Sequence, residues 1–272
     1  MNIVIPSDLS LESESAVLNL VPLLTDRLVK VTLYHCVESV IFGGSGMINI
    51  SDILVQNAER KLNELGRELS KQSEHSIEVD CHTTIGQLHM QLSEFISSTV
   101  PDFVIIPSIR KRFFDRLLVG QRSLWFIGEL SVPTLIVPFD VTLEKINVGL
   151  AMDQREGIDD SIISELNHFS GLFESSIKQF HIDDLSEDDF SFYLDSEKQV
   201  NDDTHVSIVQ SVHIESGIKK WCANNDISVL AMVTHPKSFI QKNFVHSTIR
   251  HLVKENELSI LILTKKDKST NG

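Results

Sequence analysis

Charged and histidine side chains follow short apolar runs of this sequence, at points where a strand would end. Asp8 follows the run NIVIP, His35 ends the run VKVTLYHC, and the basic trio Arg110, Lys111 and Arg112 follows DFVIIP. If these runs are parallel strands, ligands bind beyond their carboxyl ends, so these side chains are candidates for holding an anion such as a phosphate. Four segments should meet there, namely Pro6–Ser10, His35–Glu38, residues 107–112, and Gly120 with the helix after it.

Catalytic chemistry receives little support from the sequence. There is no G-x-S-x-G elbow, Walker loop or Cys–His pair at a known spacing. The 11 histidines show no metal-ligand spacing such as HExxH, and we interpret His235, His246 and His251 as partly exposed or capping residues. We therefore expect no catalytic residue and no metal site. Asp8 either approaches a bound nucleotide or shapes the turn after its strand, and the basic trio is either an anion site or a solvated loop.

Composition restricts the class of protein. The formal net charge of the 272-residue chain is −14 at pH 7, which argues against a nucleic-acid binder and against docking on anionic membranes. The three cysteines, Cys36, Cys81 and Cys222, show no CxxC spacing, so we expect reduced and buried thiols. The sequence shows no signal peptide, and no apolar stretch approaches the ~18 residues that span a bilayer. We expect a cytoplasmic protein.

Short β-rich runs alternate with helical patterns in the first half of the chain. Runs that are apolar on both faces suit parallel strands covered by helices on each side. Ser10 is a candidate N-cap for the first helix. This alternation predicts a doubly wound α/β fold. The expected strands are 2–6, 29–36, 76–84, 102–107 and 133–138, and the expected helices are 10–24, 52–72, 87–99 and 121–130.

The same pattern recurs in the second half. Residues 146–154 correspond to residues 2–10, so Asp153 corresponds to Asp8. Residues 228–263 correspond to residues 102–137. The second half is shorter between its second and third strands, where an acidic stretch, 183–203, has room for one short helix. The repeat predicts two tandem domains, 1–140 and 141–272, which bury one half against the other as a pseudo-two-fold pair.

Over nearly its whole length, the chain resembles the tandem form of the universal stress protein family. The segments that carry the resemblance are IVIPSDLS, VTLYHCVE, GQLHMQLSEF and RLLVGQRS…VPTLIVP, in that order and spacing. The resemblance implies an adenine nucleotide alpha hydrolase-like fold, with a five-stranded parallel sheet of order 3-2-1-4-5 in each half. Many members of that family bind ATP, and others do not.

In ATP-binding members the phosphate loop reads G-x2-G-x9-G-(S/T). Here the pattern falls on Pro107, Arg110, Gly120 and Gln121, so a single glycine remains; the second half has Val233, Pro236, His246 and Ser247 and no glycine. Proline lacks the N–H that would meet phosphate, and arginine occupies its space, although the helix N-terminus still favours an anion. The resemblance gives these candidate binding residues: Pro6, Asp8, His35, Pro107, Arg110, Gly120, Gln121 and Arg122.

Two functions are compatible with this pattern. The favoured one is a non-enzymatic stress-response or signalling module with degraded ATP-binding loops, which acts through protein contacts or an unidentified small ligand. The alternative is a nucleotide-binding protein or slow ATPase that uses the first-domain pocket. No cofactor is certain, and ATP, AMP or a phosphate-like anion in the first domain stays open. The expected partner is the other half of the chain, with a homodimer left open.

Overall fold

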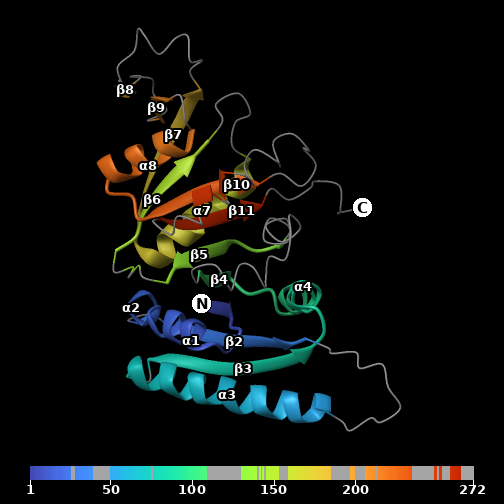
Figure 1. Cartoon of the computed structure of the whole chain (residues 1–272). Coiled ribbons are helices and arrows are strands. Elements are labelled where there is room, and N and C mark those ends of the chain that lie inside the picture. The colour runs from blue at the N-terminus through green and yellow to red at the C-terminus, as the bar shows by residue number, and fades with distance from the viewer. Residues whose placement is uncertain are drawn as a thin grey trace. The chain divides into compact units, whose positions relative to one another are not determined.

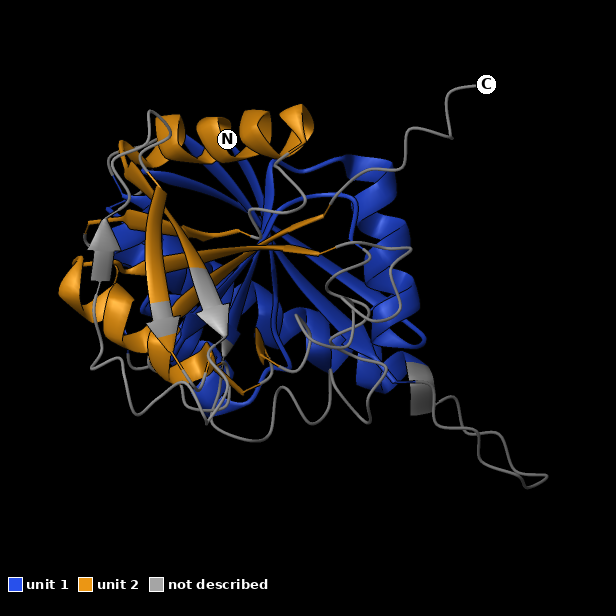
Figure 2. Cartoon of the chain, turned by 90° about the horizontal axis from the view of Figure 1, so that it is seen from above, with its two compact units in different colours: residues 1–142 blue, residues 143–272 orange. Residues whose placement is uncertain are grey.

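The computed structural model divides into two compact units, Met1–Thr142 and Leu143–Gly272 (Figure 1, Figure 2). That each unit is a complete domain of the expected kind stays a prediction. Among the described residues, no helix is both long and apolar enough to span a membrane. The structure describes residues 1–25, 28–38, 50–74, 76–108, 130–139, 141, 143, 145–152, 159–184, 197–199, 206–211, 214–234, 248–249, 251–252 and 258–264.

Unit 1 is built on a parallel sheet in the order β3-β2-β1-β4-β5. Its central strands are apolar on both faces and buried, as strands covered by helices on each side must be. The order 3-2-1-4-5 expected from the sequence is therefore confirmed. The strands are β1 (Asn2–Pro6), β2 (Val29–Val37), β3 (Ile77–Ile85), β4 (Phe103–Ser108) and β5 (Thr134–Pro138).

Helices cover both faces of this sheet. On one face, α3 packs along β2 and β3 and contacts α1, with Gly66 of α3 against the side chains of Leu33 and Cys81 (Figure 1). On the other face, α4 packs against β2, where Phe95 meets Tyr34 at a ring-centroid distance of 5.1 Å. The helices are α1 (Leu11–Leu18), α2 (Val21–Leu24), α3 (Ile50–Gln72) and α4 (Leu88–Thr99).

The helix expected over residues 10–24 is wrong in one respect, because the segment forms two short helices. Its N-cap is as expected: the Ser10 hydroxyl accepts from the backbone N–H of Ser13 at 3.2 Å. However, α1 ends at Leu18, and α2 begins at Val21 with Pro22 in its first turn. Proline lacks the N–H that a continuing helix needs, so it suits only the first turn of the new helix.

Unit 2 repeats this sheet, with the order β11-β10-β6-β7-β9-β8. The outermost strand, β8, is an addition that pairs antiparallel with β9. The sequence did not predict this strand, and the short helix expected nearby stays a prediction because residues 185–196 lie outside the described part. The elements are β6 (Asn147–Ala151), α7 (Asp160–Phe173), β7 (Ser176–Asp184), β8 (Glu197–Gln199), β9 (Val206–Ser211), α8 (Ile214–Asn224), β10 (Val229–Thr234) and β11 (Ser259–Thr264).

The strand registers of the two units coincide residue for residue in the repeated strands. Val4 pairs with Val104 in unit 1, and Gly149 pairs with Leu230 in unit 2. Val104 in turn pairs with Thr134, as Leu230 pairs with Ile260. These are the pairs that the sequence repeat predicts, so the repeat extends to the hydrogen-bonding pattern of the sheets.

Candidate functional site

The carboxyl ends of three adjacent strands lie together at one edge of the unit 1 sheet. β1 stands between β2 and β4, with Pro6 paired to Tyr34 and Val4 paired to Val104. This arrangement brings the expected segments Pro6–Ser10 and His35–Glu38 side by side, with the end of β4 next to them. The remaining expected site residues, namely Arg110, Gly120, Gln121 and Arg122 with Lys111 and Arg112, lie outside the described residues.

Two prolines lie near the carboxyl ends of β1 and β4. Pro6 is buried at the end of β1, and the N–H of the next residue, Ser7, donates to the carbonyl of Tyr34 at 2.9 Å. Pro107 is buried within β4 and pairs with Val137 of β5. Neither proline has an N–H to offer to a ligand, so the backbone at these two positions cannot donate to a phosphate.

Asp8 shapes the turn between β1 and α1. Its Oδ1 accepts two hydrogen bonds from Ser10, one from the backbone N–H at 2.9 Å and one from the hydroxyl at 2.6 Å. Ser10 in turn caps α1, so the carboxylate fixes the residue that begins the helix. This is the structural role that the sequence left open. Asp8 Oδ2 has no hydrogen-bond partner in the structure's described residues.

A buried pair of serines supports the same turn. The hydroxyls of Ser7 and Ser13 lie 3.0 Å apart, and both side chains are almost fully buried. The Ser7 hydroxyl also accepts from the N–H of Leu9, which is held in the left-handed region at a φ of 56°. Non-glycine residues seldom occupy that region, so the turn is locally constrained and its bonds help to hold it.

His35 locks the end of β2 to the end of β1. Its Nδ1 lies 2.8 Å from the carbonyl oxygen of Ser7, so Nδ1 carries the proton and donates. Burial lowers the pKa of His35 below the usual histidine value, while the Ser7 bond and the nearby Asp8 charge oppose that shift. The backbone hydrogen bond expected for His35 is confirmed. At neutral pH the ring is a neutral structural clamp.

The loop after β3 completes this edge on the β2 side. The N–H of Gly86 donates to the Val37 carbonyl at 3.0 Å, and the thiol of Cys36 donates to the Gly86 carbonyl at 3.4 Å. Gly86 has a φ of 146°, a backbone conformation that residues with a side chain rarely adopt. A Cβ there would also meet the Gln91 side chain at 2.9 Å. Burial raises the pKa of the Cys36 thiol to about 11, so it stays a thiol at neutral pH.

The second unit repeats one part of this site. His181 Nδ1 lies 2.9 Å from the Met152 carbonyl oxygen, at the register position that His35 holds in unit 1. The Thr234 hydroxyl, at the end of β10, donates to the Leu263 carbonyl at 3.3 Å. Val233 lies in β10. The other expected residues of this pocket, Asp153, Pro236, His246 and Ser247, lie outside the described residues.

The described part of the site is held together by its own polar side chains. Ser7, Asp8, Ser10 and His35 each bond to another group of the same turn. The Ser10 hydroxyl lies 2.6 Å from an Asp8 carboxylate oxygen, but the same hydroxyl caps α1, so this pair holds the turn. The sequence missed the Ser7–Ser13 pair and His181. The serine-rich stretch SDLSLESES and the histidine in QFHIDD were the available signals.

Comparisons with known proteins agree on the fold. A family model described as "Universal stress protein family" matches residues 1–138 of the chain. A comparison with curated protein sequences gives no match. A universal stress protein from Archaeoglobus fulgidus DSM 4304 is similar at a TM-score of 0.69 and 14% identity, over 98% of this chain and 97% of that one.

Two further solved structures are similar to the chain. A putative universal stress protein from Pseudomonas aeruginosa UCBPP-PA14 has a TM-score of 0.57 and 14% identity, over 97% of this chain and 92% of that one. A universal stress protein in complex with cAMP covers 50% of this chain and 96% of its own, at a TM-score of 0.36 and 14% identity. The identities with both full-length matches are low, so they establish the fold alone, and the third match supports no argument.

Proposed function

This chain belongs to the universal stress protein family, and we propose that it is a non-enzymatic binding module of the stress response. Family membership supports the stress-response role. The observation that carries the proposal is that the polar side chains at the carboxyl edge of unit 1 are already used within the fold. Asp8 binds Ser10, and His35 binds the Ser7 carbonyl. Asp8 Oδ1 and His35 Nδ1 thus hold the turn, and these two atoms are not available to a substrate.

The lost glycines also support a non-enzymatic role. Pro107, which stands at the first glycine of the family's loop pattern, is buried within a paired strand and has no N–H. Arg110 stands at the second glycine and brings a long side chain to a place where the backbone would approach phosphate. A triphosphate therefore loses the backbone donor at Pro107, worth about 1–3 kcal/mol to a charged group, and the close backbone approach at Arg110.

The tandem arrangement is part of the proposal. The matching registers of the two units support a second domain of the same family in residues 141–272. Its loop positions hold no glycine, so we expect no nucleotide there. Pairing of the two halves within one chain stays a prediction.

One observation favours the alternative of a nucleotide-binding protein or slow ATPase. Asp8 Oδ2 has no hydrogen-bond partner among the described residues, and Asp8 lies where family members place an acidic residue beside the nucleotide. In this alternative, Gly120 and the basic side chains of Arg110, Lys111 and Arg112 would take the phosphates. The alternative requires ATP, AMP or a smaller anion to bind in unit 1 alone.

Calorimetric titration of the full chain with ATP, ADP, AMP and cyclic AMP separates the two functions. We expect ATP to bind more weakly than about 1 mM, or roughly −4 kcal/mol, and phosphate release no faster than in buffer. Micromolar ATP binding that Gly120→Val abolishes would establish the alternative. Gly171→Val is the matched control, because a Cβ at Gly171 meets nothing within 4 Å. A stoichiometry of two nucleotides per chain would contradict the empty second site.

A gain-of-binding experiment tests the cause directly. We expect the double variant Pro107→Gly, Arg110→Gly to bind ATP measurably, because it restores bare backbone at both positions. Pro138→Gly is the control, since Pro138 is a buried proline in the adjacent strand β5. If the double variant binds no better than the control, glycine loss is not what closed the site.

A further inference from the structure

The β3 strand forms an open edge of the unit 1 sheet. It is nine residues long and, among the described residues, pairs only with β2. An edge strand of this length presents a row of backbone N–H and C=O groups that can pair with another strand. Most proteins obstruct such an edge with charged side chains or a bulge, so the direction in which the β3 side chains point decides whether this edge can be used.

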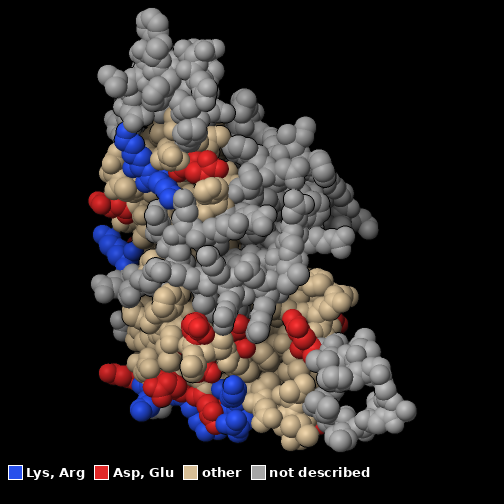
Figure 3. Space-filling view, in the orientation of Figure 1, with Lys and Arg blue, Asp and Glu red and all other residues tan. Residues whose placement is uncertain are grey.

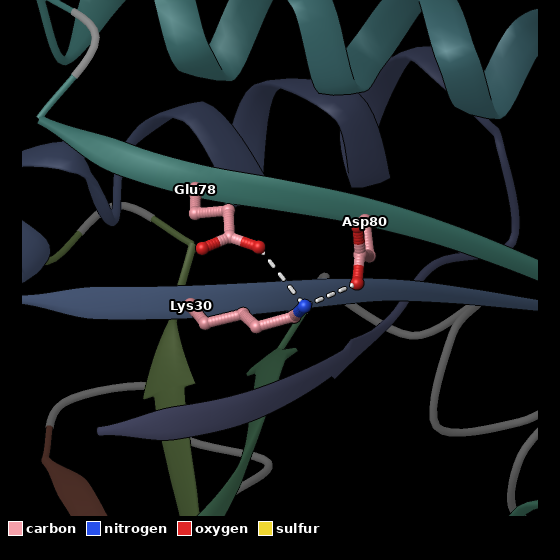
Figure 4. Close-up of polar contacts among 3 residues, drawn as sticks. All are labelled: Lys30, Glu78 and Asp80. Atoms are coloured by element: carbon pink, nitrogen blue, oxygen red, sulfur yellow. Dashed lines mark hydrogen bonds and ion pairs between the residues drawn. The ribbon is translucent and has the colours of Figure 1, made fainter.

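The polar side chains of β3 are held back over the sheet. Glu78 and Asp80 both turn toward Lys30 of β2, with carboxylate oxygens 2.9 and 2.8 Å from its Nζ (Figure 4). The His82 ring lies against Phe95 of α4, with ring centroids 4.5 Å apart. These contacts draw the three side chains away from the free side of the strand. The outer backbone row is therefore not blocked by the charges that β3 carries.

The equivalent edge of unit 2 shows what such an edge accepts. There β9 occupies the place of β3, and β8 pairs with its outer side in the antiparallel direction. Lys198 of β8 stands opposite Ile208 of β9. The repeated fold therefore tolerates an additional antiparallel strand at this position, and unit 1 has none among its described residues.

We propose that the β3 edge of unit 1 pairs with β3 of a second copy of this chain, antiparallel and centred on Cys81. In that register Asp80 of each copy stands opposite His82 of the other, and Glu78 stands opposite Thr84. No like charges face each other. Moving the centre to Asp80 would set Asp80 against its own copy, and moving it to Val79 would set Glu78 against Asp80, which cross-strand repulsion disfavours. A centre at His82 would also avoid like charges but would set Asp80 against Thr84, so the centre at Cys81 is favoured because it sets Asp80 opposite His82.

The flanking helix is compatible with this pairing. Since α3 lies over β2 and β3, the α3 helices of two paired copies would run antiparallel about two strand spacings apart, roughly 10 Å, a normal distance for packed helices. α3 carries four acidic and four basic residues, so it has no net charge even though the chain carries −14. Acidic and basic side chains lie together at this end of unit 1 (Figure 3). The helix that would flank the interface therefore adds no net charge to it.

Sedimentation velocity of the full chain over a micromolar concentration series tests the interface. We expect a monomer–dimer equilibrium. His82→Asp, which sets two carboxylate pairs face to face, should raise the dimer Kd about tenfold or more. Ser207→Asp is the matched control, because Ser207 holds the register position of His82 in unit 2, where β8 already occupies the edge. That variant should leave the Kd unchanged.

Disulfide trapping tests the register independently of affinity. Directly opposed positions of an antiparallel pair bring their Cβ atoms within disulfide range. A mixture of the Asp80→Cys and His82→Cys proteins should therefore form a mixed covalent dimer that neither protein forms alone at a comparable rate. The wild-type Cys81 is not expected to crosslink, because its thiol donates to the Leu62 carbonyl beneath α3.

Two results would overturn the proposal. One is a chain that stays monomeric throughout the concentration series and gives no mixed disulfide. The other is a dimer whose Kd is unchanged by His82→Asp and which traps no 80–82 pair, because such a dimer uses another surface. Circular dichroism of each variant checks that the fold is intact. The side chains of Asp80 and His82 are exposed in the unpaired chain.

Discussion

The two units share their strand registers but fill the space between sheet and helix differently. Val4 of β1 in unit 1 occupies the same strand position as Gly149 of β6 in unit 2. Phe95 of α4 is the residue equivalent to Trp221 of α8. A Cβ built on Gly149 would meet Trp221 at 2.8 Å and Ile227 at 3.0 Å. Unit 2 therefore has a larger ring on the helix and no side chain on the strand. In unit 2 the ring on the helix thus occupies space that a strand side chain at position 149 would need.

The units also differ in the segment after their second strand. Unit 1 covers β2 and β3 with the long helix α3, which buries Val31 and Leu33. Unit 2 has Ile177 and Gln179 at the equivalent positions, and both are only half-buried. The described residues between β7 and β9 form the short strand β8. Among the described residues, the segment between β7 and β9 thus adds a strand to the edge of the sheet, whereas the corresponding segment of unit 1 adds the helix α3.

The largest expected effect comes from exchanging the strand residue alone. Gly149→Val gives unit 2 the side chain of unit 1 while keeping Trp221, so the new methyl groups have no room. We expect a loss of about 3 kcal/mol in the free energy of unfolding. Urea denaturation followed by circular dichroism measures it. Gly171→Ala, on the open side of α7, should change stability by less than about 1 kcal/mol.

A second substitution, at Trp221, tests whether this loss of stability comes from the shared space. Adding Trp221→Phe to Gly149→Val rebuilds the unit 1 combination inside unit 2, and should recover at least about 1 kcal/mol relative to the sum of the single changes. Strict additivity of the two substitutions would mean that the strand and helix residues do not share one volume. In that case the comparison between the units would be wrong at this position.

The histidine clamp provides the second comparison. His35→Ala removes the bond to the Ser7 carbonyl and should cost about 1–2 kcal/mol at pH 7. His181→Ala removes the equivalent bond to Met152 and should cost a similar amount at that pH. Urea midpoints of both variants test whether the clamp contributes equally in the two units. A loss in one unit alone would show that only one turn depends on it.

The pH dependence of His35 has a definite sign. Burial lowers its pKa in the folded chain, so the unfolded chain binds more protons as the pH falls below about 6.5, the ordinary histidine value. The stability that neutral His35 contributes is complete above that pH and decreases as the pH falls toward the lowered pKa. The difference in stability between wild type and His35→Ala should therefore shrink between pH 7.5 and pH 5.5. A difference that grew over this range would contradict a buried neutral ring.

Much of the fold was predictable because its signals are local and repeated. Apolar runs such as NIVIP and DFVIIP directly indicate buried parallel strands, and the repeat in the sequence predicted the registers of the second sheet. Ser10 was recognisable as an N-cap because its side chain type suits that position. The break between α1 and α2 was missed, because the expected helix ran through Pro22, although a proline suits only the first turn of a helix.

The site was less predictable, because its contacts join residues through tertiary structure. The Ser7–Ser13 pair depends on the left-handed turn at Leu9, and no local sequence signal predicts that turn. β8 is three residues long and has no apolar alternation that would identify it as a strand. The roles of Gly120 and Arg110 stay predictions, since both lie outside the described residues. Sequence reasoning thus succeeded where one element determines its own structure and stopped where several elements meet.

The smallest expected effect concerns the residues that end α4 and α8. Val100 ends α4 in the left-handed region at a φ of 43°, and Asp226 follows α8 at a φ of 55°. The left-handed conformation destabilises a β-branched residue by about 1–2 kcal/mol, whereas aspartate tolerates it. Val100→Gly should therefore stabilise the chain by about 0.5–1 kcal/mol after the entropy cost of glycine, and Asp226→Gly should change it by less than about 0.5 kcal/mol.

Different hydrogen bonds close these two turns. In unit 2 the N–H of Ile227 donates to the Cys222 carbonyl at 2.9 Å and closes the turn around Asp226. In unit 1 the equivalent residue is Pro101, which has no N–H, so that bond cannot form. The carbonyl of unit 1 that is equivalent to that of Cys222 belongs to Ile96, and it accepts instead from the N–H of Val100 at 2.9 Å, so the two turns are closed by different residues. Thermal unfolding of both glycine variants tests this account, and equal shifts in Tm would show that the two turns are energetically alike despite their different residues.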